Sequence, residues 1–494
     1  MHTCKVNPGY KYCDRHMISD IKMDRKFTRK ARLVADGHKT NIPSSITYSS
    51  VVSRESVRLA LLIASLNDLD ISCCDIVNAY LNAGCREKLW TVAGAEFGSE
   101  KGTVMIIARV LYGLKSSGAA WRVKFAETMK IMGYESTHAD PDVRIKRAVK
   151  PKGQECYCYI LVYVDDVLHV HYYNPEIDMK LLSSFYRLND GIGIPSRYLG
   201  ANIEKVQLED SREVWSMTCF DYIKGAIRNI NDMLEKDKVA MKIFGDGHRL
   251  YPSSYRLEMN VSELLTDTLI NRYQHLIGML RWSIKLGRID IQTEVSCLSQ
   301  HLCAPRNGHL NAVYLIFRYL QKNIGRNPGR IVFDPLMEYD DENIFNEPLD
   351  KEEWVDFYPD ASEAIPRNML ELLGNPVLVR AWVDANHAGN LENRRSHSGI
   401  LIYVNNALVL SFNKRQNTVE SSSFGSELVA LRIATDMIEA LRYKLRCFSI
   451  PIDGPSTVLC DNNSVVTNSS VPISVLNKTH NAICYHRVRE AQAA

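Results

Sequence analysis

The sequence has almost no net charge and no framework of paired cysteines. Its 494 residues carry 60 basic and 57 acidic side chains, for a net charge of +3. This balance excludes a uniformly basic surface, so any contact with nucleic acid must come from a local patch. The 13 cysteines are odd in number and include no C-x-x-C pair, which argues against a disulfide framework. We therefore expect reduced thiols in a cytosolic or nuclear protein.

Long apolar runs are also missing. No stretch is long enough to cross a bilayer, and the N-terminus lacks a secretory signal pattern. We expect a protein that is not secreted and has no membrane partner. The remaining composition is ordinary for a globular chain, with 46% hydrophobic and 24% charged residues. The length predicts about three domains.

Two carboxylates interrupt a buried-strand pattern between Cys156 and His171. Asp165 and Asp166 lie there between runs of aliphatic and aromatic residues. Burying such charges is unfavourable unless a cation compensates them. A turn at a strand end is the simpler explanation, but the strand pattern resumes at Val167 without Gly or Pro. We therefore predict a hairpin that presents both carboxylates to a divalent metal ion.

A second strand pattern, from Ile71 to Leu81, carries one carboxylate, Asp75. An isolated Asp at a strand end is commonly a cap or a turn residue. Its significance rises because a two-metal site needs a third acid beside Asp165 and Asp166. We predict that the three carboxylates meet.

Basic residues cluster near the N-terminus, between positions 22 and 32. They are Lys22, Arg25, Lys26, Arg29, Lys30 and Arg32. A solvated charged face or a nuclear-import patch would explain this cluster. A phosphate-binding segment would explain it equally, because Lys and Arg side chains neutralise phosphates.

Three segments resemble the reverse transcriptases of copia-type long-terminal-repeat retrotransposons. Tyr163-Val-Asp-Asp166 is similar to the family's catalytic signature, and the stretch from Lys30 to Gly37 is similar to its fingers motif. The stretch from Arg109 to Trp121 resembles the "LYGLK…AW" motif. The resemblance implies the residue roles given next.

The resemblance assigns Asp75, Asp165 and Asp166 to catalysis and metal binding. Lys30 and Arg32 are implied to face the triphosphate of the incoming nucleotide. Tyr80 matches the aromatic steric gate that excludes a ribose 2′-hydroxyl. Gly113 and Lys115 would lie beneath the template and the nucleotide, with Gly113 permitting close backbone approach.

A second set of acids follows a change of pattern after residue 376. A strand ends at Asp384, a hairpin is expected around Asn405-Asn406, and an amphipathic helix follows with Glu427 in its first turns. A further strand ends at Asp461. Each acid alone has an ordinary structural explanation, but their order resembles the copia-type ribonuclease H domain. That resemblance makes Asp384, Glu427 and Asp461 catalytic metal ligands.

One position departs from the ribonuclease H pattern. The family carries a fourth acid in a His-x-Asp-x-x-Tyr-His element. Here the element spans His480 to His486 and has Ala482 at the acid's position. Asn481 and Glu490 are the alternatives for its replacement, and the sequence does not choose between them.

The resemblance implies an α+β fold class: a right-hand polymerase of fingers, palm and thumb, then a connection and an RNase H-like α/β domain. The predicted ranges are 1–235 for fingers and palm, 236–333 for thumb and connection helices, 334–376 for an acidic linker, and 377–494 for the RNase H-like domain.

The implied activity is RNA-directed DNA polymerisation by two-metal phosphoryl transfer. Its cofactor would be Mg²⁺, two per active site, with Mn²⁺ as an alternative. The implied partners are an RNA template, a DNA primer, dNTPs and an RNA–DNA hybrid, with a cytoplasmic (virus-like particle) or nuclear location. Capsid, protease and integrase patterns are missing, so we expect a fragment of a polyprotein. The alternative is a catalytically inactive remnant that at most binds nucleic acid.

Overall fold

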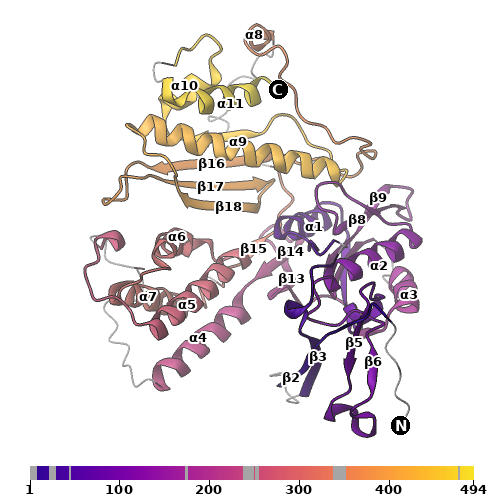
Figure 1. The fold of residues 1–494 in the computed structure, drawn as a ribbon. Coiled ribbons are helices and arrows are strands. Elements are labelled where there is room, and N and C mark those ends of the chain that lie inside the picture. Colours follow the sequence, from indigo (N-terminus) through magenta and orange to yellow (C-terminus); the bar gives the residue numbers. More distant parts are fainter. Residues whose placement is uncertain are drawn as a thin grey trace. The chain divides into compact units, whose positions relative to one another are not determined.

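The computed structural model describes residues 8–21, 29–43, 46–172, 176–236, 250, 255–326, 328–337, 352–476 and 479–494 (Figure 1). The chain forms two compact units. The first comprises residues 1–53 and 70–194, and the second comprises residues 54–69 and 195–494. Three residues of the predicted basic cluster, Lys22, Arg25 and Lys26, lie outside the described residues.

The first unit is built on a six-stranded sheet in the order β11-β4-β10-β9-β8-β7. Its strands are β4 (Asp70–Ile76), β7 (Glu135–Ser136), β8 (Val143–Val149), β9 (Glu155–Tyr163), β10 (Asp166–His171) and β11 (Leu188–Gly193). β9 is buried from residue 156 to residue 162, as its continuous apolar run predicts. The central strands β4, β9 and β10 pair in antiparallel fashion.

Two helices cover one face of this sheet, α2 (Ser117–Ile131) and α3 (Glu176–Phe185). Trp121 and Phe125 of α2 pack in one apolar cluster with Ile160 and Val167 of the sheet. Met179 of α3 joins the same cluster. The helices therefore anchor the strands that carry the three N-terminal acids.

Two smaller sheets complete the first unit. One is a hairpin of β2 (Arg15–Ile21) and β3 (Arg29–Ala35), and the other contains β1 (Lys11–Tyr12), β5 (Leu89–Val92) and β6 (Val104–Ile106). The end of β3 lies against the segment around Gly113, where the Ala35 amide donates to the Tyr112 carbonyl over 2.7 Å. Gly113 has φ +91° there.

The second unit begins with α1 (Arg54–Leu66), which carries Glu55 in its first turn. A four-stranded sheet follows, with β12 (Arg197–Tyr198), β13 (Ala201–Gln207), β14 (Glu213–Thr218) and β15 (Ile331–Val332). Helices α4 (Phe220–Lys236), α5 (Asp267–Leu286), α6 (Gln292–Leu298) and α7 (Asn307–Asn323) lie between β14 and β15 in the chain.

The C-terminal part of the second unit is a sheet in the order β18-β17-β16-β19. It contains β16 (Val379–Asn386), β17 (His397–Val404), β18 (Ala407–Arg415) and β19 (Thr457–Cys460). β16 is antiparallel to β17 and parallel to β19. The hairpin predicted around Asn405-Asn406 is confirmed.

The long helix α9 (Ser423–Cys447) lies along this sheet (Figure 1). Helices α10 (Asn463–Ser470) and α11 (Ala482–Ala493) pack on the side of α9 that faces away from the sheet. The apolar face of α9 is buried, as the amphipathic pattern predicts: Leu428, Leu431, Ile438, Leu441 and Leu445. The Ser422 side chain caps its first turn by accepting from the Gly425 amide.

Part of the predicted acidic linker packs on the second unit. Trp354 of α8 (Glu352–Val355) is buried beneath the Arg489 guanidinium, which lies 4.8 Å from its ring centroid. Burial opposes the ionisation of Glu363, but hydrogen bonds from Arg446 and Arg442 lower its pKa to about 2. These contacts tie residues 352–376 to the unit.

The fold is a mixture of helices and sheets, in agreement with the expected class. The two compact units do not follow the predicted domain ranges, because residues 54–69 belong to the second unit and the first unit ends at residue 194. The domain ranges remain predictions. Among the described helices, none combines the length and the apolar character needed to span a bilayer.

Gly113→Ala should destabilise the first unit. A Cβ atom built there would lie 2.1 Å from the Ala35 carbonyl oxygen, in a backbone conformation that L residues rarely adopt. We expect a loss of about 2–5 kcal/mol, the sum of the backbone and steric costs. Hydrogen exchange at the Ala35 amide and thermal unfolding would measure it.

Gly153→Ala is the matched control, because Gly153 also has a positive φ, +84°, but an added Cβ would meet nothing within 4 Å. It should cost only about 1 kcal/mol. Equal effects of the two substitutions would contradict the steric explanation.

Candidate functional site

Strand pairing brings together the acids predicted in the first unit. In the antiparallel pair of β4 and β10, Asp75 lies directly opposite Asp166. Asp165 precedes β10 in the turn that joins it to β9, and its carbonyl accepts from the Ile76 amide over 2.9 Å. All three side chains are half-buried. The geometry therefore places three carboxylate-bearing residues at one end of the sheet.

The turn between β9 and β10 is very tight. Tyr163 pairs with Asp166, so that Val164 and Asp165 alone form the turn. Val164 has φ +59°, a conformation that is unfavourable for a β-branched residue. The Trp121 indole donates to the Val164 carbonyl over 2.7 Å. This bond, which no local sequence pattern predicts, ties the turn to helix α2.

Asp166 is perturbed by its surroundings. Burial, and then the charges of Asp165 and Asp75, raise the pKa of Asp166 to about 6. Asn189 of β11 donates to the Asp75 carboxylate over 2.7 Å and so fixes one of its oxygens. A divalent cation would relieve the repulsion among these carboxylates. The carboxylate chemistry of these residues therefore fits the metal ions that the resemblance implies, although their ligand atoms are not grouped within 4.8 Å of one another.

Two aromatic rings lie beside the acids. Tyr80, in a 3₁₀ turn (Ala79–Asn82), packs edge-on against Tyr112 with 4.9 Å between ring centroids. Burial, followed by the charge of Asp165, raises the pKa of both tyrosines. The Arg32 guanidinium of β3 lies 5.4 Å from the Tyr112 ring centroid. The structure thus groups Arg32, Tyr112 and Tyr80 on the side of Asp165.

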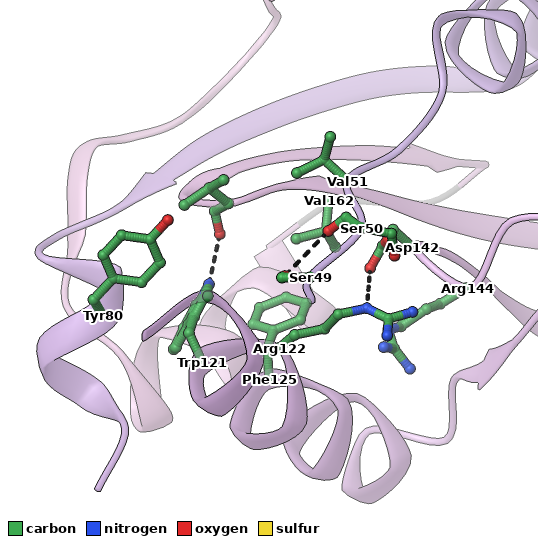
Figure 2. Close-up of a pocket in the computed structure, with 12 residues that line it drawn as sticks. Ser49, Ser50, Val51, Tyr80, Trp121, Arg122, Phe125, Asp142, Arg144 and Val162 are labelled. Carbon is green, nitrogen blue, oxygen red and sulfur yellow. Dashed lines mark hydrogen bonds and ion pairs between the residues drawn. The ribbon is translucent and has the colours of Figure 1, made fainter. Parts of the chain in front are cut away.

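A pocket adjoins the hairpin turn, and Tyr80, Trp121 and Val164 are among its lining residues (Figure 2). Arg122 also lines it and pairs with Asp142 over 2.9 Å. Trp121, which the sequence analysis did not assign to the site, therefore connects this pocket with the turn that carries Asp165.

The other predicted residues of the first unit are placed as follows. Lys30 belongs to β3, but its side chain lies outside the described residues. The Lys115 ammonium donates to the Thr40 carbonyl over 2.7 Å. Gly113 makes the close approach to Ala35 described above. The predicted phosphate and base contacts of these residues remain predictions.

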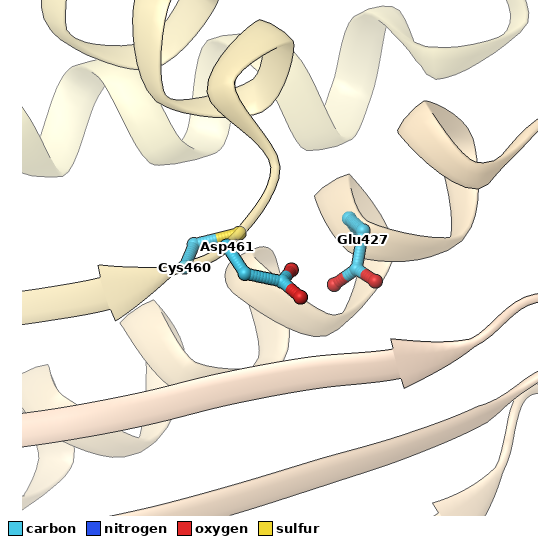
Figure 3. A group of neighbouring side chains, drawn as sticks. All are labelled: Glu427, Cys460 and Asp461. Atoms are coloured by element: carbon cyan, nitrogen blue, oxygen red, sulfur yellow. The ribbon is translucent and has the colours of Figure 1, made fainter.

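The second set of acids also converges. Asp384 lies on β16, Asp461 follows the parallel strand β19, and Glu427 lies in the first turns of α9. Parallel neighbours end at the same edge of a sheet, which brings Asp384 and Asp461 near the start of the helix. Figure 3 shows the carboxylates of Glu427 and Asp461 facing one another.

Glu427 is the buried member of this set, at 5% exposure, whereas Asp384 and Asp461 are exposed. Its Oε1 accepts from the Ala385 amide over 3.1 Å. Burial, and then the charges of Asp384 and Asp461, raise its pKa to about 7, although the Ala385 bond opposes the shift. Its Oε2 is buried without a hydrogen-bond partner among the described residues. An unsatisfied buried oxygen of this kind suits a metal ligand.

The element that departs from the pattern lies at the start of α11. Ala482 is the first residue of the helix, and Asn481 precedes it as a buried N-cap residue. His486 bonds the Tyr358 hydroxyl over 2.8 Å. Glu490, one of the two alternatives for the fourth acid, is exposed on α11.

Sequence comparisons show which proteins the chain is similar to, and the family match covers most of the first unit and the beginning of the second. Residues 9–243 match the family described as reverse transcriptase (RNA-dependent DNA polymerase). This match includes Asp75, Asp165 and Asp166.

Individual proteins that are similar to nearly the whole chain come from plant retrotransposons. The chain is 26% identical over 479 residues to the retrovirus-related Pol polyprotein from transposon TNT 1-94 of Nicotiana tabacum, an alignment that covers 94% of the chain and 32% of that protein. It is 22% identical over 474 residues to that from transposon RE2 of Arabidopsis thaliana, with 93% and 28% covered. The predicted resemblance to a copia-type reverse transcriptase region is confirmed, and the chain spans about a third of these relatives' length.

Asp166→Asn should stabilise the first unit at neutral pH. The folded-state pKa of about 6 exceeds the usual 3.8, so the folded protein binds more protons between these values and loses stability as pH rises through that window. The amide removes this cost, which is at most about 3 kcal/mol. Urea unfolding at pH 7.5 should show the gain.

Urea unfolding of the variant and the natural chain near pH 4 provides the control. Asp166 is then largely protonated in the folded state, so the stability gained by Asp166→Asn should be smaller. Mg²⁺ should narrow the difference at pH 7.5 by neutralising the carboxylates. An Asn variant that is equally destabilised at both pH values would contradict this account.

Proposed function

We propose that the protein is an RNA-directed DNA polymerase whose metal-binding carboxylates are Asp75, Asp165 and Asp166. The observation that carries the proposal is the register of β4 and β10, which sets Asp75 opposite Asp166 within a stretch that matches the reverse transcriptase family. In this proposal the sheet and helices α2 and α3 form the palm. RNA template, DNA primer and dNTPs are the partners.

The three carboxylates would hold two Mg²⁺ ions, or Mn²⁺ in their place. When bound there, such ions would supply a lower pKa for the primer 3′-hydroxyl and positive charge opposite the triphosphate and the leaving pyrophosphate. The protein's own contribution is to hold the acids in place. Asn189 orients Asp75, and the bond from Trp121 holds the turn that carries Asp165.

The residues around the acids would select and hold the nucleotide. We assign Arg32 and Lys30 to the triphosphate, because β3 places Arg32 beside Tyr112. Tyr80 would exclude a ribose 2′-hydroxyl, since its ring lies on the side of Asp165. Gly113 and Lys115 would contact the template and nucleotide. Lys115 would then have to exchange its bond to Thr40 for a ligand oxygen.

The second set of acids supports a ribonuclease H-like site acting on an RNA–DNA hybrid. Asp384, Glu427 and Asp461 would be its metal ligands, and the buried, unpartnered Oε2 of Glu427 supports this assignment. Ala482 favours the alternative of an inactive centre at this second site, because it supplies neither charge nor ligand.

Asp75→Asn should reduce primer extension on an RNA template by about 100-fold or more, because a misplaced metal ion has large effects on rate. Asp70→Asn is the control, since Asp70 starts the same strand and pairs with His171 at the opposite end. Extension by the Asp75 variant at the wild-type rate would show that the activity does not come from this site.

Cleavage of an RNA–DNA hybrid by the natural chain should be weak or absent, and Ala482→Asp should increase it. An acid at the first position of α11 also suits the helix dipole, so the substitution should not reduce stability. Cleavage over a Mg²⁺ and Mn²⁺ titration would measure the gain. Robust cleavage by the natural chain in low Mg²⁺ that is lost in Glu490→Gln would instead identify Glu490 as the replacement ligand.

A further inference from the structure

A cysteine lies within the second group of acids, and the proposed nuclease chemistry does not use it. Cys460 is the last residue of β19, directly before Asp461. One ligand atom each from Glu427, Cys460 and Asp461 lies within 4.8 Å of the other two (Figure 3). Asp384 is outside this group of three. The group therefore offers one sulfur and two carboxylate oxygens to a single ion.

The buried glutamate provides independent support for a ligand at this position. Glu427 is 5% exposed, and its Oε1 is already satisfied by the Ala385 amide. Its Oε2 is buried and has no hydrogen-bond partner in the described part of the chain. Leaving such an oxygen unpaired is costly, and its carboxylate faces that of Asp461 (Figure 3). A cation between them would satisfy it.

The sulfur determines which cation fits best. Mg²⁺ takes oxygen ligands and retains its waters, so Cys460 contributes nothing to its binding. Zn²⁺ binds thiolate and carboxylate together, at roughly 2.3 Å and 2.0–2.2 Å, and open zinc sites use three protein ligands and a water molecule. Tetrahedral ligands at these lengths are roughly 3.5 Å apart. The three atoms lie within 4.8 Å of one another, so they need to approach by at most about 1.3 Å.

We propose that Glu427, Cys460 and Asp461 form a binding site for a thiophilic divalent cation, with Zn²⁺ as the physiological candidate. The Cys460 sulfur binds as the thiolate, and its proton passes to solvent. Exposed Asp461 leaves the fourth position open to water. At mixed oxygen and sulfur sites the affinity for zinc exceeds that for Mg²⁺ by a wide margin.

Zinc at this position would occupy two carboxylates that the proposed nuclease centre needs for Mg²⁺. Zinc should therefore inhibit hybrid cleavage, and this consequence rests on the proposed nuclease function. The binding itself does not, because it involves only the three side chains. A test of binding without nucleic acid thus separates failure of this proposal from failure of the nuclease assignment.

Co²⁺ is the probe, because a thiolate–cobalt bond produces a charge-transfer absorption band that oxygen ligands do not produce. We expect the full chain to show this band at one equivalent of Co²⁺ and to lose it when Zn²⁺ displaces the cobalt. Cys460→Ser should abolish the band and weaken Zn²⁺ binding by about tenfold or more. Glu427→Gln should weaken it similarly.

Cys484→Ser is the matched control. Cys484 is also half-buried and packs against the same apolar cluster as Cys460, but it is not one of the three grouped residues. Its substitution should leave the Co²⁺ band and the Zn²⁺ affinity unchanged. Circular dichroism would verify folding, and Cys460→Ala would replace the serine variant if that variant unfolds.

Two results would overturn the proposal. One is the binding of Co²⁺ by the natural chain without a charge-transfer band, which can be measured without any variant. The other is a folded Cys460 variant whose band and Zn²⁺ affinity equal those of the natural chain, which would assign the band to other thiols.

Discussion

The pairing of β4 with β10 is the constraint on which the first acidic site depends. It places Asp75 directly opposite Asp166, although two neighbouring carboxylates repel each other. Backbone pairing along the two strands, from Asp166 with Asp75 to His171 with Asp70, maintains the register. Val167, Leu168 and Val170 are fully buried, and their burial contributes roughly 1.5–3 kcal/mol each. The apolar part of β10 thus offsets the electrostatic cost at its end.

A second constraint acts on the turn. Val164 adopts a positive φ in a two-residue connection, where glycine or asparagine would be more favourable. A conformation of this kind persists when its surroundings impose it. The indole of Trp121 does so from helix α2, and Trp121 itself packs in the cluster beneath the sheet. The position of Asp165 therefore depends on the packing of a distant helix, because Trp121 and Val164 are 43 residues apart in the chain.

Local patterns predicted much of this architecture. The apolar run of β9, the hairpin at Asn405-Asn406 and the buried stripe of α9 follow from residue periodicity. Asp165 and Asp166 were predicted as metal ligands because they interrupt an apolar strand, whereas Asp384, Glu427 and Asp461 were assigned through the resemblance to the copia-type ribonuclease H domain. Their pairing register could not be read from the sequence, because it depends on which strands become neighbours.

Contacts between distant segments had no local signal. Asn189 reaches Asp75 because β11 joins the edge of the sheet beside β4, and the two residues are 114 positions apart. Lys115 was predicted as a ligand contact, yet its ammonium bonds the Thr40 carbonyl. Polar residues of this kind have several possible partners, and only tertiary packing chooses among them. The same holds for Cys460, whose strand pattern alone resembles that of any buried thiol.

The two acidic sites hold their perturbed carboxylates in different structural surroundings. In the first, antiparallel neighbours set Asp166 against two other acids, and all three remain half-buried. In the second, exposed acids at the ends of parallel strands approach Glu427, whose own burial is nearly complete. Burial is the largest cause of the raised pKa at both sites, and the charges of the neighbouring acids add to it, so that the pKa is about 6 for Asp166 and about 7 for Glu427. Near neutral pH a cation therefore competes with a proton at Glu427 more than at Asp166.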